Sequence, residues 1–106
     1  MFPRFRKRPA PQAQPLFALG SLQLSEKVYW LASKSLIDPL PYVQRHLAGD
    51  WGDAGEAEQQ ANAVAFDQGA PIRSRYRITP HLFLLVITSD DHRTTVVQLP
   101  EERDLI

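Results

Sequence analysis

The spacing of apolar residues along the chain changes from helical to strand-like near residue 72. In Ile72–Ile78, apolar or small residues alternate with three arginines, which is the period of a strand with one buried face. Leu82–Thr88 is apolar at nearly every position, and Thr94–Leu99 is a third strand-like run. Because the segments between these runs are short, the pattern predicts a three-stranded antiparallel meander.

An extended segment and a first helix are predicted before this sheet. Leu16–Ser25 alternates imperfectly and is interrupted by Gly20, which favours a short strand or an extended arm. Ser25 then suits the N-cap of a helix over Glu26–Lys34. The apolar residues at helical spacing in it are Val28, Leu31 and Ala32.

The second helix has the clearest boundaries in the sequence. Asp38 suits its cap, Pro39 its first position, and Gly49 the left-handed residue after its end. Tyr42 and His46, four residues apart, share one face. The stripe predicted to face inward consists of Leu40, Val43 and Leu47.

A third helix is predicted from about Ala54 to Gln68, where Gly69 stops it. A stripe of small residues along it permits close approach to a sheet or to another helix. This stripe consists of Ala57, Ala61, Val64 and Ala65.

Together these elements define an α+β fold. It has two or three short helices followed by the three-stranded antiparallel meander, and the N-terminal arm is a candidate fourth strand. We expect residues 16–106 to form a single domain with helices over one face of the sheet. Residues 1–15 hold four prolines and four basic side chains but no acid, so we expect a disordered basic tail.

The middle strand, Leu82–Thr88, is apolar on both faces, although an antiparallel sheet usually leaves one face polar. Helices and the N-terminal arm packing on both sides would cover the second face. A partner chain would also cover it, since an exposed apolar patch often marks an interaction surface. A homodimer that buries this face is one form of the second alternative.

Composition narrows the class of protein. The chain of 106 residues fits one soluble domain and contains no cysteine, which excludes structural disulfides and thiolate zinc sites. It holds no apolar run long enough to span a membrane and no secretory signal, so we expect a cytoplasmic protein. Glycine-rich phosphate loops, dinucleotide fingerprints and zinc motifs are absent, and we expect no cofactor and no metal.

The stretch Arg45–Glu56, which reads RHLAGDWGDAGE, contains several side chains that could serve in catalysis or metal binding. If the helix continued past residue 47, His46 and Asp50 would lie on one face, as an acid/base pair or a metal-binding pair requires. Gly49, however, is expected to end the helix before Asp50. We favour a structural hinge built from Gly49, Asp50, Trp51 and Asp53. Asp50 would bond turn amides, Trp51 would pack between helices, and Asp53 would start a capping box with Glu56.

Two further groups are candidates for binding. Arg73, Arg75 and Arg77 form a ladder on one face of their strand, suited to phosphates or to an acidic protein surface. The predicted hairpin tip, Thr88–Thr95, adds a second set of polar side chains that a rigid scaffold presents. Its candidate binding residues are Asp90, Asp91, His92 and Arg93. In an alternative catalytic interpretation, Asp91, His92 and Arg93 serve metal-independent phosphodiester cleavage.

Several motifs resemble a family of proteins of about this size from bacterial plasmids, prophages and integrative elements. These motifs are RHLAGDWGD, N62-A-V-A65, S74-R-Y76, the VIT of Val86–Thr88 and the TTVVQLPEE of Thr94–Glu102. Members often carry the label type I restriction endonuclease subunit M, but this chain has no methyl-donor-binding domain. The family has no established activity, and the resemblance implies an accessory gene of a mobile element.

The resemblance and the residues lead to two hypotheses about function. The first is a small interaction protein of a mobile element that binds a host or defence-system protein through the sheet face or hairpin tip and inhibits host defence. The second is a small nucleic-acid-binding protein or nuclease that uses the arginine ladder, the hairpin tip or the basic tail.

Overall fold

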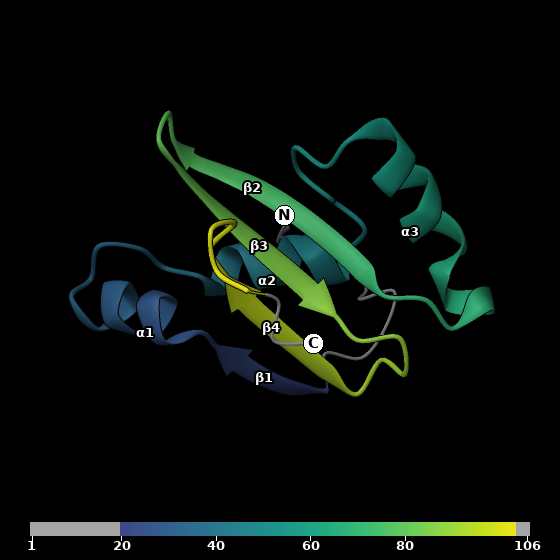
Figure 1. Ribbon diagram of the computed structural model, residues 1–106, viewed down its shortest axis with the longest axis horizontal. Coiled ribbons are helices and arrows are strands. Elements are labelled where there is room, and N and C mark those ends of the chain that lie inside the picture. The colour runs from purple at the N-terminus through teal and green to yellow at the C-terminus, as the bar shows by residue number, and fades with distance from the viewer. Residues whose placement is uncertain (1–19, 104–106) are drawn as a thin grey trace, which may run out of the picture.

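The computed structural model describes residues 20–103. The predicted tail at residues 1–15 and the first part of the predicted arm lie outside the described residues. Figure 1 shows the described elements in chain order. They are β1 (Ser21–Leu24), α1 (Glu26–Ser33), α2 (Leu40–Leu47), α3 (Glu56–Gln68), β2 (Ile72–Thr79), β3 (Leu82–Thr88) and β4 (Thr94–Gln98).

The strands form one sheet in the order β1-β4-β3-β2. Antiparallel pairing of β2 with β3 and of β3 with β4 confirms the predicted meander. The fourth strand is also present, but it runs parallel to β4, with Leu22 opposite Thr95. The sheet is therefore mixed. Parallel pairing needs a long connection, and here the three helices, β2 and β3 all lie between β1 and β4 in the chain.

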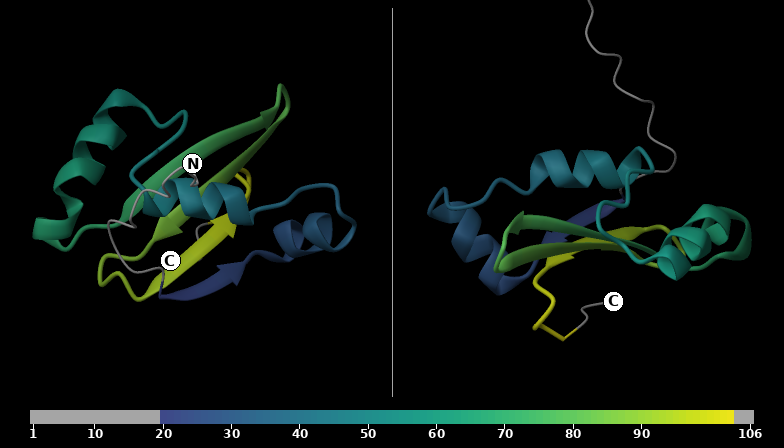
Figure 2. Two further views of the ribbon diagram at one scale, coloured as in Figure 1. Left: turned by 180° about the vertical axis from the view of Figure 1, so that it is seen from behind. Right: turned by 90° about the horizontal axis from the view of Figure 1, so that it is seen from above.

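The helices lie on one face of the sheet and beside one of its edges (Figure 2). The helix α2 crosses one face, α1 lies near the end of β1, and α3 lies alongside β2. The main core lies between the sheet and the first two helices. Its buried members are Val28, Ile37, Val43, Tyr76, Leu84, Val86, Val97 and Leu99. This α+β arrangement agrees with the predicted fold class.

The cap of the first helix agrees with its prediction, and that of the second helix agrees in part. The Ser25 hydroxyl accepts a hydrogen bond from the Val28 amide at 3.2 Å, and the Asp38 carboxylate accepts one from the Leu40 amide at 3.3 Å. The helix α2 begins one residue later than predicted, with Pro39 as its N-cap. Leu40 is a correction to the predicted inward stripe, because its side chain is 56% exposed.

The third helix begins later and packs differently from its prediction. It starts at Glu56 with Gly55 as N-cap, and Gly69 ends it in the left-handed conformation as expected. Of the predicted stripe of small residues, only Ala65 is buried, whereas Ala57, Ala61 and Val64 are exposed. Asn62, which is not part of the predicted stripe, is buried as well.

The second face of the sheet carries the C-terminal turn, residues 99–103, instead of a helix (Figure 2). The Gln98 side-chain amide donates to the carbonyl oxygens of Glu102 at 3.2 Å and Arg103 at 3.3 Å. On the same face Ile87 is buried, whereas Phe83 is only half-buried. Within residues 20–103 no helix covers this face, and the first part of the N-terminal arm, which was the other candidate to cover it, lies outside the described residues. No helix in that range is long and apolar enough to cross a membrane.

Candidate functional sites

The Arg45–Glu56 segment forms the turn that its glycines predict. The helix α2 ends at Leu47, and Gly49 follows with φ of 88°. The Asp50 carboxylate accepts a hydrogen bond from the Gly52 amide at 3.1 Å and forms an ion pair with Arg45 at 2.6 Å. The hydrogen bond from Arg45 lowers the pKa of Asp50. Asp50 therefore stabilises the turn, and its carboxylate bonds to Arg45 and Gly52 instead of to the imidazole of His46.

The predicted capping box at the start of α3 is wrong. The Asp53 carboxylate accepts a hydrogen bond from the Arg77 amide at 3.1 Å on β2, instead of capping the helix. The Asp53 amide donates to the Arg75 carbonyl oxygen at 2.6 Å, and Gly52 forms a bridge with Arg75. The outer edge of β2 thus competes successfully for Asp53, because its backbone groups otherwise lack partners on that side.

His46 is fully buried on the inner side of α2, where its two ring nitrogens contact two hydroxyl side chains of the sheet. Its Nδ1 lies 2.5 Å from the Ser74 hydroxyl, and its Nε2 lies 2.9 Å from that of Thr88. The Thr88 and Thr95 hydroxyls lie 2.8 Å apart. Burial lowers the pKa of His46 to about 3, so the imidazole is neutral at pH 7.

This cluster, called here the His46 network (His46, Ser74, Thr88 and Thr95), has the atoms of a nucleophile and a base. A serine beside a histidine is the arrangement used in acyl transfer. However, Ser74 is 1% exposed and His46 is 0% exposed, so a substrate cannot approach the hydroxyl. The network therefore satisfies buried polar groups between α2 and three strands.

Two aromatic side chains join the turn to the same region. The Tyr76 hydroxyl donates to the Asp50 carbonyl oxygen at 2.6 Å, and burial raises its pKa. The Arg45 guanidinium lies over the Tyr76 ring at 4.7 Å. The Trp51 ring meets His46 edge-on, with centroids 5.8 Å apart. Trp51 thus packs against α2.

At the hairpin tip, Asp91 and Ser89 form hydrogen bonds that stabilise the turn itself. The Asp91 carboxylate accepts hydrogen bonds from the Ser89 hydroxyl at 2.6 Å and the Arg93 amide at 3.0 Å, and the first of these lowers its pKa. The His92 Nε2 atom lies 3.2 Å from the Ala70 carbonyl oxygen. Asp90 and the Arg93 side chain are exposed. Because Asp91 and His92 turn toward different partners, the geometry does not assemble them for catalysis.

The arginine ladder lies on the second face of the sheet, beside apolar side chains of β3. The register places Arg77 opposite Phe83 and Arg75 opposite Leu85. The Arg75 guanidinium stacks on the Phe83 ring at 4.4 Å, and Arg77 is exposed. Arg73 is half-buried. In the described part of the chain, neither Arg75 nor Arg77 has an ion-pair partner.

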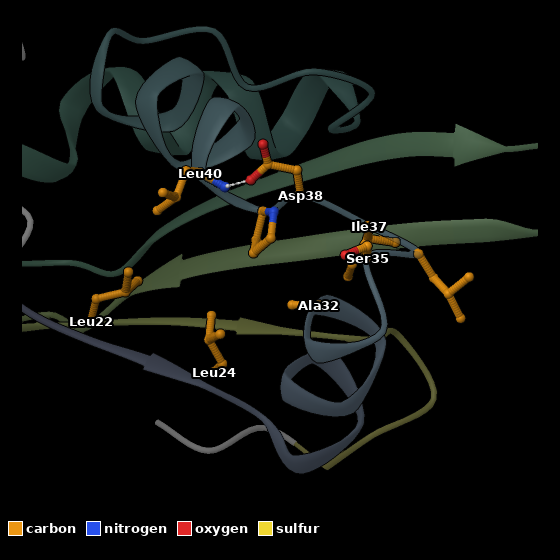
Figure 3. A pocket seen from close by; sticks show the side chains of 9 residues that line it. Leu22, Leu24, Ala32, Ser35, Ile37, Asp38 and Leu40 are labelled. Atoms are coloured by element: carbon orange, nitrogen blue, oxygen red, sulfur yellow. Dashed lines mark hydrogen bonds between the residues drawn. The ribbon is translucent and has the colours of Figure 1, made fainter.

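An apolar groove lies on the helix face of the sheet, and it is not among the sites predicted from the sequence (Figure 3). Leu22 and Leu24 of β1 point into it, and the residues between α1 and α2 close its sides. Its volume is about 680 Å³. It is lined by Leu22, Leu24, Ala32, Ser35, Leu36, Ile37, Asp38, Pro39 and Leu40. The signal that would have found it is the run of apolar residues at 36, 37 and 40 in a predicted connection.

Large apolar side chains are exposed around the groove and on α1. Leu36 is 61% exposed at the rim, and Tyr29 and Trp30 on α1 are 65% and 54% exposed. A small protein rarely leaves several large apolar residues of one segment in water unless they take part in binding. Among the side chains that the structure describes, no group is suited to a metal ion.

The fold and these sites define a small α+β protein with a mixed four-stranded sheet and two exposed surfaces of different chemistry. No family model, curated protein or solved structure matches the chain. The resemblance to the mobile-element family therefore stays a prediction.

Proposed function

We propose that this protein acts by binding another protein through the apolar groove between β1 and the α1–α2 connection. The observation that carries the proposal is the exposure of Leu36 and Leu40 at the groove. Tyr29 and Trp30 on α1, outside the groove, extend the exposed apolar surface, and all four side chains are more than half exposed. Tyrosine and tryptophan contribute strongly to protein interfaces because they bury a large area at a small entropic cost. The groove replaces the sheet face and hairpin tip as the proposed contact surface.

The experiment compares protein capture by the wild type and by surface variants. Leu36→Lys with Leu40→Lys introduces charge at the groove, and Val64→Lys introduces it at an exposed apolar residue of α3, 43% exposed. We expect at least one protein from the native cell extract to be retained by the wild type and by Val64→Lys, but not by the groove variant. If every captured protein binds all three equally, the groove is not the contact surface.

The setting of this activity is proposed on the resemblance alone. If the gene belongs to a mobile element, the bound protein is a component of the host or of its defence system, which the small protein inhibits. Identification of the captured protein by mass spectrometry tests this proposal. A captured protein unconnected with host defence would contradict it.

A second candidate function is nucleic-acid binding on the other face of the sheet. The exposed Arg75 and Arg77, with Phe83 beside them, favour it, since arginine meets phosphates and an aromatic ring meets bases. Binding of single-stranded RNA and DNA should weaken steeply as salt rises from about 50 mM to about 200 mM, and Arg75→Ala with Arg77→Ala should reduce the slope. Absence of binding at about 50 mM salt would exclude this function.

A further inference from the structure

The backbone groups at one edge of the sheet have hydrogen-bond partners, whereas those at the other edge have none among the described residues. Along the outer edge of β2, the Asn62 side chain exchanges two hydrogen bonds with the Arg73 backbone, at 2.7 and 3.0 Å. The Arg75 backbone is bonded to Trp51 and Asp53. These contacts occupy the donors and acceptors that would otherwise pair with a further strand.

The edge formed by β1 has no such protection. Ser21 and Ser25 direct their amides to β4, with hydrogen bonds of 2.8 Å to Arg93 and 2.9 Å to Val97. Because alternate residues direct their backbone groups to opposite edges, Leu22 and Leu24 direct theirs away from β4. Within residues 20–103 no strand lies on that side. The strand also lacks a charged residue, a proline and a bulge, which are the usual means of blocking an edge.

The sequence of this edge is suited to pairing with itself. Residues 21–25 read Ser-Leu-Gln-Leu-Ser, which is the same in both directions about Gln23. In an antiparallel pair with a two-fold axis at Gln23, each Leu22 lies opposite the partner's Leu24 on the helix face. Each serine lies opposite a serine, and Gln23 lies opposite the partner's Gln23. Every cross-strand pair then matches in polarity, and no like charges oppose each other.

We propose that a second copy of this chain pairs antiparallel with β1, so that two sheets become one. Leu22 and the partner's Leu24 exchange both backbone hydrogen bonds in this arrangement. The interface is isologous, as expected for a two-fold dimer. Because Leu22 and Leu24 also line the groove, the two grooves meet across the axis and form one longer apolar surface. That consequence rests on the proposed function, whereas the pairing of the strands does not.

Cysteine crosslinking of the full-length protein tests the register, since the natural chain has no cysteine. In the proposed pair the two Gln23 Cα atoms lie about 4.5 Å apart, within the range of a disulfide. Under mild oxidation, Gln23→Cys should form a covalent dimer. The matched control Ser21→Cys should not, because each residue 21 lies opposite the partner's residue 25, about 14 Å along the strand from its own copy. Equal crosslinking by the two variants, or none by Gln23→Cys, would overturn the proposal.

The mass of the purified protein supplies an independent measurement. Light scattering at micromolar concentration should give twice the chain mass of 12.0 kDa for the wild type. Leu22→Pro removes an outward-facing amide without removing a β4 hydrogen bond, and it should give the monomer mass with native circular dichroism. A wild-type monomer would overturn the proposal, as would a dimer that Leu22→Pro leaves intact. Both experiments use the pure chain, so their failure is distinct from failure to capture another protein.

Discussion

Stability should depend on pH through His46, because this side chain is buried in its neutral form. The imidazole is 0% exposed, and two of its neighbours within hydrogen-bond distance are the uncharged hydroxyl groups of Ser74 and Thr88. Protonation would place a charge in the core between α2 and the sheet, where no described carboxylate is bonded to it. The folded protein therefore resists protonation, and the unfolded chain does not.

The size of the effect follows from the two pKa values. In the unfolded chain the pKa of His46 is the ordinary 6.5, and in the folded protein it is about 3. Between these values the unfolded chain binds more protons, so stability falls by about 1.4 kcal/mol for each pH unit below 6.5. The full contribution is present above pH 6.5, and at pH 5 about 2 kcal/mol of it is lost. The lowered pKa values of Asp50 and Asp91 place their effects below this window.

Urea unfolding at several pH values from about 7.5 to about 5 measures this loss. The wild type should lose about 2 kcal/mol, whereas His46→Gln should show a much flatter profile in the same range. His81→Asn combined with His92→Asn is the matched control, and it should retain the wild-type slope. A free energy of unfolding that is constant down to pH 5 would refute the argument. An equal slope in His46→Gln would also refute it.

Three other changes test the contacts that hold the turn and the sheet edge. Gly52→Ala should destabilise the protein by about 2 kcal/mol or more, since Gly52 has φ of 67° and an added Cβ would meet the Arg75 carbonyl oxygen. Gly55→Ala, where a Cβ meets nothing within 4 Å, should change the melting temperature little. Asn62→Ala should cost about 1–3 kcal/mol and speed hydrogen exchange of the Arg73 amide, while exposed Gln60→Ala should do neither. Ser74→Ala should cost about 1–3 kcal/mol by removing a partner of buried His46, and calorimetry that shows unchanged stability would contradict this.

Local patterns sufficed for much of the fold. Alternation over Ile72–Ile78 and the short connections predicted the meander, and Ser25 predicted a cap that the structure contains. These features depend on neighbours in sequence, so they can be read without knowledge of the tertiary structure. The parallel pairing of β1 with β4 could not, because it joins residues more than seventy positions apart.

The predictions of side-chain contacts are wrong where two hydrogen-bond partners compete for one side chain. Asp53 at the start of a helix is a normal cap, yet it bonds to the Arg77 amide, because that edge of β2 needs an acceptor. The predicted stripe consists of small residues and does not include Asn62, although Asn62 is buried and its side chain bonds α3 to the Arg73 backbone. Sequence spacing identifies the side chain available for a contact but does not rank distant partners for it.

The motif that carries the family resemblance has a structural explanation in this fold. His46, Ser74, Thr88 and Thr95 meet in one buried network, and Asp50 is tied to Tyr76 through its carbonyl oxygen. Together these residues join α2 and the following turn to three strands. Because the polar atoms of these residues form hydrogen bonds within the fold, the motif has a structural role. Under the function and the strand pairing proposed above, binding specificity depends on side chains outside the motif, which are those of the groove and of the unprotected β1 edge.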